Sequence, residues 1–132
     1  MRVHLCRHAQ AAPGGPDDLR ELTPAGVEQA RALAERLAAR TDPPVAVLSS
    51  PLVRARQTAD AISEALGLIT EPRDELLPGA TVASLRRALV DVRGPVAVVG
   101  HQPDCSEIAL ALTGRDPGFR PGDTHAVELT LE

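Results

Sequence analysis

The fold of this chain is constrained most by three short apolar runs, which cover residues 3–7, 45–48 and 96–99. A strand with one solvent-exposed face alternates apolar and polar residues, whereas a continuous apolar run is typical of a strand buried on both faces. Helical patterns separate the runs, which favours parallel strands. The sequence therefore predicts an α/β three-layer sandwich, a mostly parallel central sheet with helices on both faces. No linker or repeat divides the chain, so we expect a single domain over residues 1–132.

Four helices are expected from apolar residues spaced three or four apart. Thr23-Pro24 predicts the start of the first helix, because threonine is a good N-cap and proline suits the first helical position. Ser49-Ser50-Pro51 predicts the start of the second in the same way, and Gly67 predicts its end. The third helix should end at Gly94-Pro95 and the fourth at Gly114. The expected core faces are residues 27, 30, 34 and 37; 52, 55, 59, 62 and 66; 82, 85, 89 and 92; and 105, 108, 109 and 112.

Other segments read less regularly. Residues 11–18 are expected to form a loop, and residues 68–78 a short strand followed by a loop. The C-terminal segment alternates apolar and polar residues, the pattern of a strand with one solvent-exposed face, so we expect an edge strand there. Its apolar residues Val127, Leu129 and Leu131 alternate with Glu128, Thr130 and Glu132.

Composition excludes several classes of function. The net charge of −4 argues against a protein that binds nucleic acid through a basic field. All 14 basic residues are arginine, so the chain has neither a Schiff-base lysine nor a P-loop lysine. The chain has no tyrosine or tryptophan and a single phenylalanine, Phe119, so stacking on nucleobases is excluded as well. We therefore expect no nucleic-acid partner.

The two cysteines, Cys6 and Cys105, are too few for a disulfide framework and do not form a Cys-x-x-Cys pair. Both fall on apolar faces, so we interpret them as small core residues. The sequence has no signal-peptide pattern and no apolar run of about eighteen residues. These features predict a soluble, cytoplasmic protein with no membrane partner.

Each of the three apolar runs ends in residues that suit an anion. The first ends in Arg7-His8 and the last is followed by Gly100-His101. The second leads into Ser49-Ser50-Pro51, with Arg54 in the helix that follows. The carboxyl ends of parallel strands meet at one edge of a sheet, where α/β proteins bind their ligands. Guanidinium groups and helix N-termini both bind phosphate, so the residue types predict a site for a phosphoryl dianion.

Histidines at this edge indicate phosphoryl transfer. A neutral imidazole is a competent nucleophile toward phosphorus, and neighbouring arginines lower its pKa and so favour the neutral form. We interpret His8 as this nucleophile. His101 would then contact the equatorial phosphoryl oxygens, either as a cation or as a hydrogen-bond donor.

Three motifs recur in the same order in one known family. They are Arg7-His8-Ala9, Ser49-Ser50-Pro51-Leu52-Val53-Arg54-Ala55-Arg56-Gln57-Thr58-Ala59 and Gly100-His101-Gln102-Pro103. Together they resemble the histidine phosphatase superfamily, also called phosphoglycerate-mutase-like. The segment Leu22-Thr23-Pro24-Ala25-Gly26 resembles the first helix of that family, so the resemblance covers nearly the whole chain. The Arg-His-Ala-Gln-Ala version, residues 18–23 and the short length are most similar to the bacterial phosphohistidine phosphatases of the SixA type.

The resemblance implies a role for individual residues. His8 would be the phosphorylated nucleophile, and Arg7, Arg54 and His101 would complete the phosphate pocket. Glu75 is the candidate for the general acid, because in the superfamily that acid usually follows the corresponding segment. No metal and no organic cofactor is implied.

Two departures from the wider superfamily bear on the substrate. Many members have glycine where this chain has Ala9; alanine is usual in the short branch and disfavours a mutase. Larger members insert a lid after the second helix, whereas residues 68–95 leave little room for one. An open pocket suits a phosphohistidine displayed on another protein, whose imidazole leaving group needs less help from a general acid than an alkoxide does.

Simpler interpretations hold for several other residues. His4, Cys6 and His8 alternate along one strand like zinc ligands, but no ligand loop flanks them. We expect His4 to be a packed or hydrogen-bonded histidine and His125 to be a surface residue near a turn. Neither cysteine has an arginine six positions later, so the cysteine-phosphatase loop is absent. Solvated surface charges are expected at Arg56, Arg86 and Arg87.

The sequence thus predicts a metal-independent phosphatase that forms a phosphohistidine intermediate. The expected partner is a phosphorylated protein of the histidine-phosphotransfer type. Two alternatives remain open: a small-molecule phosphomonoesterase of the same superfamily, and a non-catalytic module that binds phosphate. Activity confined to sugar or nucleotide phosphates would favour the first alternative, and no turnover of an aryl phosphate would favour the second.

Overall fold

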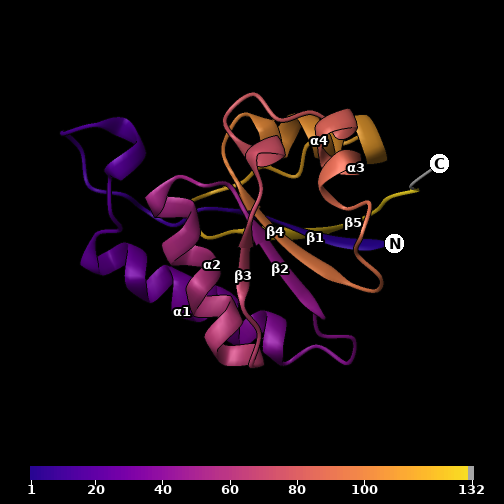
Figure 1. Cartoon of the computed structure of the whole chain (residues 1–132), viewed down its shortest axis with the longest axis horizontal. Coiled ribbons are helices and arrows are strands. Elements are labelled where there is room, and N and C mark those ends of the chain that lie inside the picture. Colours follow the sequence, from indigo (N-terminus) through magenta and orange to yellow (C-terminus); the bar gives the residue numbers. More distant parts are fainter. Residues whose placement is uncertain (131–132) are drawn as a thin grey trace.

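A computed structural model describes residues 1–130, and within them a five-stranded sheet forms the middle layer (Figure 1). Its strands are Arg2–Arg7 (β1), Ala46–Ser49 (β2), Thr70–Pro72 (β3), Val96–Gly100 (β4) and Thr124–Glu128 (β5). They lie in the order β3-β2-β4-β1-β5. The pairs β1 with β4, β2 with β4 and β2 with β3 are parallel, and only β5 runs antiparallel, against β1. The predicted mostly parallel sheet is confirmed.

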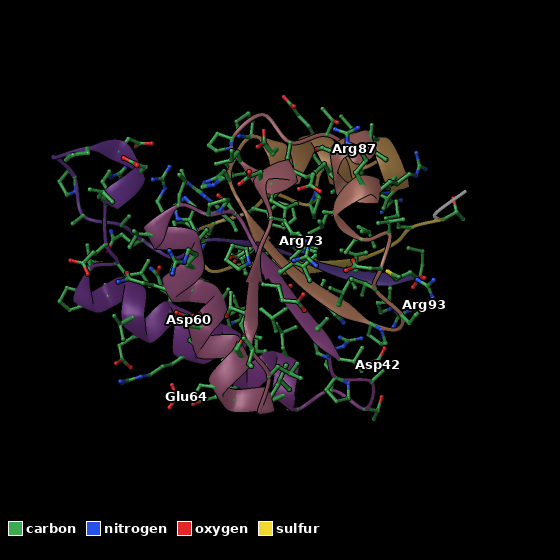
Figure 2. All side chains as sticks on the ribbon, in the orientation of Figure 1. Asp42, Asp60, Glu64, Arg73, Arg87 and Arg93 are labelled. Carbon is green, nitrogen blue, oxygen red and sulfur yellow. The ribbon has the colours of Figure 1, made fainter. Side chains whose placement is uncertain are left out.

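Helices cover both faces of this sheet. The α-helices are Pro24–Ala38 (α1), Val53–Leu66 (α2), Val82–Ala88 (α3) and Asp104–Thr113 (α4), and two short 3-10 helices are Asp17–Leu19 (η1) and Asp74–Leu76 (η2). Helices α1 and α2 pack on one face, and α3 and α4 on the other (Figure 1). The outer side of α2 is polar, with Asp60 and Glu64 exposed (Figure 2). The three-layer α/β architecture predicted from the sequence is therefore confirmed.

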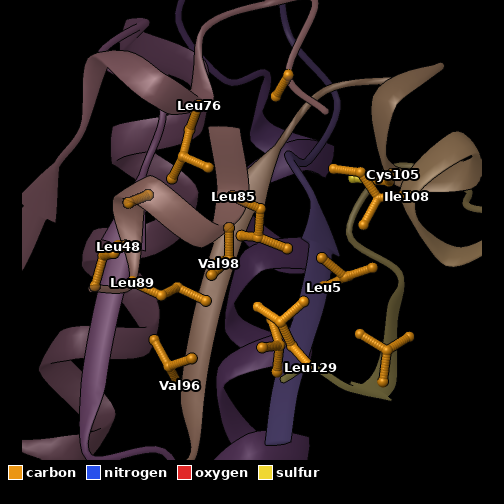
Figure 3. Close-up of a cluster of buried hydrophobic side chains, with 14 of the residues drawn as sticks. Leu5, Leu48, Leu76, Leu85, Leu89, Val96, Val98, Cys105, Ile108 and Leu129 are labelled. Carbon is orange, nitrogen blue, oxygen red and sulfur yellow. The ribbon is translucent and has the colours of Figure 1, made fainter. Parts of the chain in front are cut away.

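The sheet divides the core into two apolar clusters, because successive residues of a strand point to opposite faces. Leu5 of β1 packs with Leu85 of α3 and Ile108 of α4 on one face (Figure 3). Its neighbour Cys6 joins the other cluster, which contains Leu33 of α1. Each fully buried leucine contributes about 1.5–3 kcal/mol by removal of apolar surface from water. Burial on both sides therefore holds β1 in the middle of the molecule.

Three helix ends agree with the sequence pattern. Thr23 caps α1, and its side-chain oxygen accepts the Gly26 N–H at 2.9 Å. Gly67 ends α2 with a φ of 68°, and Gly114 ends α4 with a φ of 80°. Both φ angles lie in the left-handed region, where glycine has no steric penalty.

The start of the second helix differs from the prediction. Helix α2 begins at Val53, with Leu52 at the N-cap, rather than at Ser49-Ser50-Pro51. The Ser50 hydroxyl oxygen accepts the Leu52 N–H at 3.3 Å and lies 2.8 Å from His101 Nε2. Because these two contacts occupy the hydroxyl group, the serine belongs to the connection between β2 and α2 and not to a helix cap.

Two positions predicted to be buried are exposed. Val27 is 39% exposed, and Leu33 takes the buried place on α1. Val45 is 53% exposed, and β2 begins one residue later. In each case an apolar residue at the end of a pattern lies beyond the area that the neighbouring layer covers.

Helix α3 is shorter than predicted. It ends at Ala88 rather than at Gly94-Pro95. Leu89 and Val92 are nevertheless buried in the cluster on the α3 side. The apolar spacing therefore continues through the turn that follows the helix, so spacing alone could not place the helix end.

The last strand is an edge strand, as predicted, but it covers Thr124–Glu128. Its register is set by pairing with β1, where Val127 lies opposite Val3. Leu131 and Glu132 fall outside the described residues. His125, expected on the surface near a turn, is half-buried in β5, three residues after the turn at 121–122, and its ring packs edge-on against Phe119 with centroids 4.9 Å apart. Among the helices of residues 1–130, none has the length and apolar character needed to cross a membrane.

Candidate active site

The carboxyl ends of β1, β2 and β4 meet at one edge of the sheet, and the backbone continues to pair beyond them. The His8 N–H donates to the Gly100 carbonyl at 3.0 Å, and the Ser50 N–H donates to the Val99 carbonyl at 3.0 Å. These bonds hold the residues that follow each strand in place. As a result the rings of His8 and His101 lie with centroids 5.3 Å apart and planes at 61°.

The imidazole of His8 has one nitrogen in use and one free. Its Nδ1 lies 2.8 Å from the Ala9 carbonyl oxygen. A carbonyl only accepts, so Nδ1 carries the hydrogen and donates it, and Nε2 keeps its lone pair in the neutral ring. The backbone of Ala9 is itself fixed, because its N–H donates to the Thr58 hydroxyl at 3.0 Å.

Burial lowers the pKa of His8, and nearby positive charge lowers it further. The cations are Arg54, Arg7 and Arg20, in decreasing order of effect. The hydrogen bond to Ala9 opposes them by stabilising the protonated ring. The net effect is a pKa below the ordinary value of 6.5, so the ring is neutral at neutral pH.

Arg7 presents donors to the same edge. Its Nη1 donates to the Phe119 carbonyl at 2.9 Å, which anchors one side of the guanidinium. Its Nε is buried and has no hydrogen-bond partner within residues 1–130. A buried N–H of this kind is costly unless an acceptor completes it, so Arg7 is suited to hold an anion.

Arg54 lies in the first turn of α2 and is only 6% exposed. Its Nη1 donates to the Asp17 carbonyl at 2.7 Å, and its Nη2 lies 3.3 Å from the Asp17 carboxylate. Arg20 binds the other oxygen of that carboxylate at 3.1 Å. A buried guanidinium requires such compensation. The contact also demonstrates that Arg54 can take an anionic oxygen at this edge.

His101 is 3% exposed, and its Nε2 lies 2.8 Å from the Ser50 hydroxyl. Its Nδ1 is buried and without a partner among the described residues. Burial lowers the pKa of His101 to about 4, and the charges of His8 and Arg54 act in the same direction. Of the two roles that the sequence left open, the neutral hydrogen-bond donor fits this low pKa better than the cation does.

Glu75 reaches the same edge along a different route. It lies in η2, which is separated from β3 by Arg73, and the Arg73 N–H donates to the Ser49 carbonyl at 2.9 Å. The next residue, Leu76, lines a small cavity of about 20 Å³ together with His101. The Glu75 side chain is half-buried and makes no hydrogen bond or ion pair with residues 1–130. The backbone therefore brings Glu75 to the edge without joining it to the other four residues.

The other sequence predictions have clear structural counterparts. His4 is buried, and burial lowers its pKa. Burial raises the pKa of both Cys6 and Cys105 to about 12, so neither is a thiolate at neutral pH. Arg56 and Arg87 are exposed, as expected for solvated charges, whereas Arg86 is half-buried and its Nε donates to the Thr130 carbonyl at 2.9 Å. Within residues 1–130 no group of three His, Cys, Asp or Glu side chains is placed to hold a metal ion.

Several contacts at this edge were not foreseen from the sequence. Ser50 contacts His101, and Asp17 pairs with Arg54 across 37 positions of the chain. The Thr58 hydroxyl accepts from Ala9 and donates to the Arg54 carbonyl at 2.9 Å, which links α2 to the end of β1. The serine and threonine were visible in the motif, but the partners His101 and Ala9 are distant in sequence. A surface groove of about 850 Å³ lies elsewhere, between α1 and α2.

Comparison with known proteins agrees with this geometry. Residues 3–77 match the histidine phosphatase superfamily (branch 1). An uncharacterized protein of Picosynechococcus sp. is 35% identical over 120 residues, which cover 85% of this chain and 73% of that protein.

Solved structures provide a second comparison. The protein histidine phosphatase SixA, solved in complex with tungstate, superimposes with a TM-score of 0.86 at 28% identity, over 99% of this chain and 90% of that one. A candidate phosphohistidine phosphatase SixA from Agrobacterium tumefaciens gives 0.79 at 34% identity, over 95% and 89%. Mycobacterial glucosyl-3-phosphoglycerate phosphatase gives 0.68 at 22% identity, over 86% and 79%, which is a likeness of fold alone. The chain therefore belongs to the histidine phosphatase superfamily and is a phosphatase with a SixA-like fold.

Proposed function

We propose that this phosphatase hydrolyses phosphohistidine on a partner protein, through a phosphohistidine intermediate on its own His8. The proposal rests chiefly on one observation: the Nε2 lone pair of His8 is left free while Nδ1–H is held by the Ala9 carbonyl. The likeness to a protein histidine phosphatase over 99% of the chain supports the substrate class. The partner is then a histidine-phosphotransfer type of protein, and the reaction is assigned to the cytoplasm, in keeping with two free thiols.

In the first step Arg7, Arg54 and His101 hold the three non-bridging phosphoryl oxygens. The lone pair of His8 Nε2 attacks phosphorus in line with the leaving nitrogen. A bond forms from Nε2 to phosphorus, and the bond from phosphorus to the substrate imidazole breaks. The electron pair of that bond stays on the departing nitrogen. When its other nitrogen carries a proton, the substrate ring leaves as neutral imidazole and needs no further acid.

In the second step water attacks the phosphoryl group on His8. An oxygen–phosphorus bond forms, the phosphorus–nitrogen bond breaks, and the electron pair of the broken bond returns to Nε2. The phosphate leaves as H₂PO₄⁻ and carries both protons of the water. The Ala9 carbonyl accepts the Nδ1–H throughout, so it holds the ring in one orientation and stabilises positive charge on it. The guanidinium groups neutralise the charge of the phosphoryl oxygens in both steps.

Glu75 is proposed as the general acid for substrates whose leaving group needs a proton. General acid catalysis contributes about 10²- to 10⁴-fold when an alkoxide departs. We therefore expect Glu75→Gln to reduce turnover of an alkyl phosphate by about 10²-fold and to change turnover of a phosphohistidine protein little. Exposed Glu71 on β3 supplies the matched control, Glu71→Gln. If Glu75→Gln lost turnover equally on the alkyl phosphate and on the phosphohistidine protein, Glu75 would not be the general acid.

Two measurements test the function. The first compares kcat/KM for a phosphorylated histidine-phosphotransfer domain with a panel of sugar, nucleotide and aryl phosphates, with and without a chelator. A strong preference for the phosphoprotein, insensitive to the chelator, is expected. Activity confined to the small esters would establish the phosphomonoesterase alternative, and inhibition by the chelator would overturn the metal-independent reaction.

The second measurement traps the intermediate by acid quenching with labelled substrate. The label should be labile to acid on longer exposure and stable to alkali, as expected of phosphohistidine. It should be lost in His8→Ala and retained in His125→Ala, which changes a histidine of β5 outside the site. A label that persists in His8→Ala would refute His8 as the nucleophile.

A further inference from the structure

The contact between Ser50 and His101 determines more than the position of the ring. Both side chains are almost completely buried, Ser50 at 0% and His101 at 3% exposure. The Ser50 hydroxyl oxygen lies 2.8 Å from His101 Nε2. The same oxygen accepts the Leu52 N–H at 3.3 Å. Neither side chain is close enough to bulk water to exchange these partners for solvent.

These contacts specify which atom is the donor. If Nε2 carried the hydrogen, it would donate to the Ser50 oxygen, and the hydroxyl hydrogen would have no acceptor within residues 1–130. If the hydroxyl donates to Nε2, the Ser50 oxygen accepts from Leu52 and donates to His101, and both of its contacts are satisfied. The first arrangement leaves two buried groups unused, the hydroxyl hydrogen and the Nδ1 lone pair, whereas the second leaves only the Nδ1–H unused. The second arrangement is therefore favoured.

The second arrangement leaves the hydrogen of the neutral His101 ring on Nδ1. That nitrogen is buried and has no partner among the described residues. The ring lies 5.3 Å from the ring of His8, centroid to centroid. A fixed N–H beside the nucleophile is suited to a phosphoryl oxygen, which only accepts.

We propose that Ser50 is a positioning residue that holds His101 in the Nδ1–H tautomer, so that this N–H donates to the transferring phosphoryl group. The donation to phosphate rests on the proposed function, whereas the tautomer itself does not. The neighbouring Ser49 provides a matched control: it is equally buried, and its hydroxyl has no hydrogen-bond partner within residues 1–130.

The tautomer is tested by nitrogen-15 NMR of the imidazole rings at neutral pH, with the His101 signals assigned by their loss in His101→Gln. Native protein and Ser49→Ala should show a protonated Nδ1 and an unprotonated Nε2 on His101. Ser50→Ala should show both tautomers. Added inorganic phosphate should shift the Nδ1–H signal of the native protein. A native His101 protonated on Nε2 would overturn the proposal, whether or not the protein proves to be a phosphatase for phosphohistidine.

Kinetics with an aryl phosphate test the consequence. Loss of an oxyanion donor costs about 10²- to 10³-fold in kcat. Ser50→Ala keeps the His101 ring as a donor but no longer fixes its tautomer and orientation, so we expect a smaller loss of about tenfold in kcat. The loss should fall mainly on kcat rather than KM, because the bond strengthens as charge develops. Ser50→Thr should restore most of the rate. Equal losses in Ser50→Ala and Ser49→Ala, or no rescue by threonine, would overturn the proposal. Should Ser50→Ala fail to fold, the NMR result for the native protein decides it.

Discussion

The interior of β1 and its carboxyl end contain the same side chain in two different settings. His4 and His8 are four residues apart, and burial is the largest cause of a lowered pKa for both. His4 lies under the helical layer at 1% exposure, with Nε2 unpartnered within residues 1–130. His8 lies just beyond the strand, beside three arginines and a second imidazole. A lowered pKa therefore does not distinguish the two histidines; the position at the sheet edge and the converging cations do, and they are the features on which the proposed role of His8 rests.

The largest expected difference between these two regions is in catalysis. His8→Ala removes the nitrogen that we propose as the nucleophile, so we expect kcat on an aryl phosphate to fall by about 10⁴-fold or more. His4→Leu should leave kcat within about twofold of native, because the side chain faces the core. The comparison is measured with both variants at matched folded fraction, checked by circular dichroism. A comparable loss of kcat in the two variants would mean that activity depends on substitutions anywhere in β1 and not specifically on His8.

The second prediction concerns the cations that distinguish the carboxyl end. Arg54→Ala should lower kcat/KM by about 10²- to 10³-fold, because a buried guanidinium contributes charge and two directed hydrogen bonds. Arg54→Lys should recover little of this loss, since an ammonium cannot reproduce the fork. Arg56→Ala, two residues along the same helix and exposed, is the matched control and should behave as native. If Arg56→Ala loses as much, general surface charge and not the site explains the effect.

The third prediction uses pH to separate the two imidazoles. The pKa of His8 is lowered below 6.5, so its free nitrogen is unprotonated at neutral pH. This nitrogen becomes protonated as the pH falls through the lowered pKa. We expect kcat/KM, corrected for ionisation of the substrate, to be level near neutral pH and to fall about tenfold per pH unit below the His8 pKa. NMR titration of both rings supplies the two pKa values. The assignment would be contradicted if the decrease of kcat/KM at low pH matched the pKa of His4 instead of that of His8. It would also be contradicted if this decrease moved to a different pH in His4→Leu.

A related effect on stability follows from His101. Its folded pKa of about 4 lies below the ordinary 6.5, so between these values the unfolded chain binds a proton that the folded protein does not. The free energy of unfolding should therefore be highest above about pH 6.5 and decrease as pH falls toward about 4. Urea unfolding at several pH values measures this slope. His101→Gln should flatten part of it, and an unchanged slope in that variant would show that other groups cause it.

The smallest effect is expected at His4, in the interior of β1. His4→Leu replaces an imidazole whose Nε2 has no partner with an apolar side chain of similar size, so the free energy of unfolding should change by less than about 1 kcal/mol. Leu5→Ala, the next residue, creates a cavity in the opposite cluster and should cost about 2–5 kcal/mol. A large loss in His4→Leu would show that the histidine makes a structural bond after all.

The amino-acid sequence by itself determined the order of the main strands and helices and the sheet edge at which the candidate site lies. Continuous apolar runs specified buried strands, and Thr23, Gly67 and Gly114 marked helix ends, because these signals act between residues close in the chain. The convergence of His8 and His101 followed from parallel strands alone. Local chemistry and one topological rule were sufficient for these features.

Only the tertiary structure decided which atoms of the site meet. The late start of α2, the pairing of Asp17 with Arg54 and the contact of Ser50 with His101 depend on the distances between elements that are far apart in sequence. A serine after a strand has the same appearance whether its hydroxyl caps a helix or binds a distant imidazole. The choice is made when burial removes water as a competing partner and leaves each polar group only the neighbours that packing supplies.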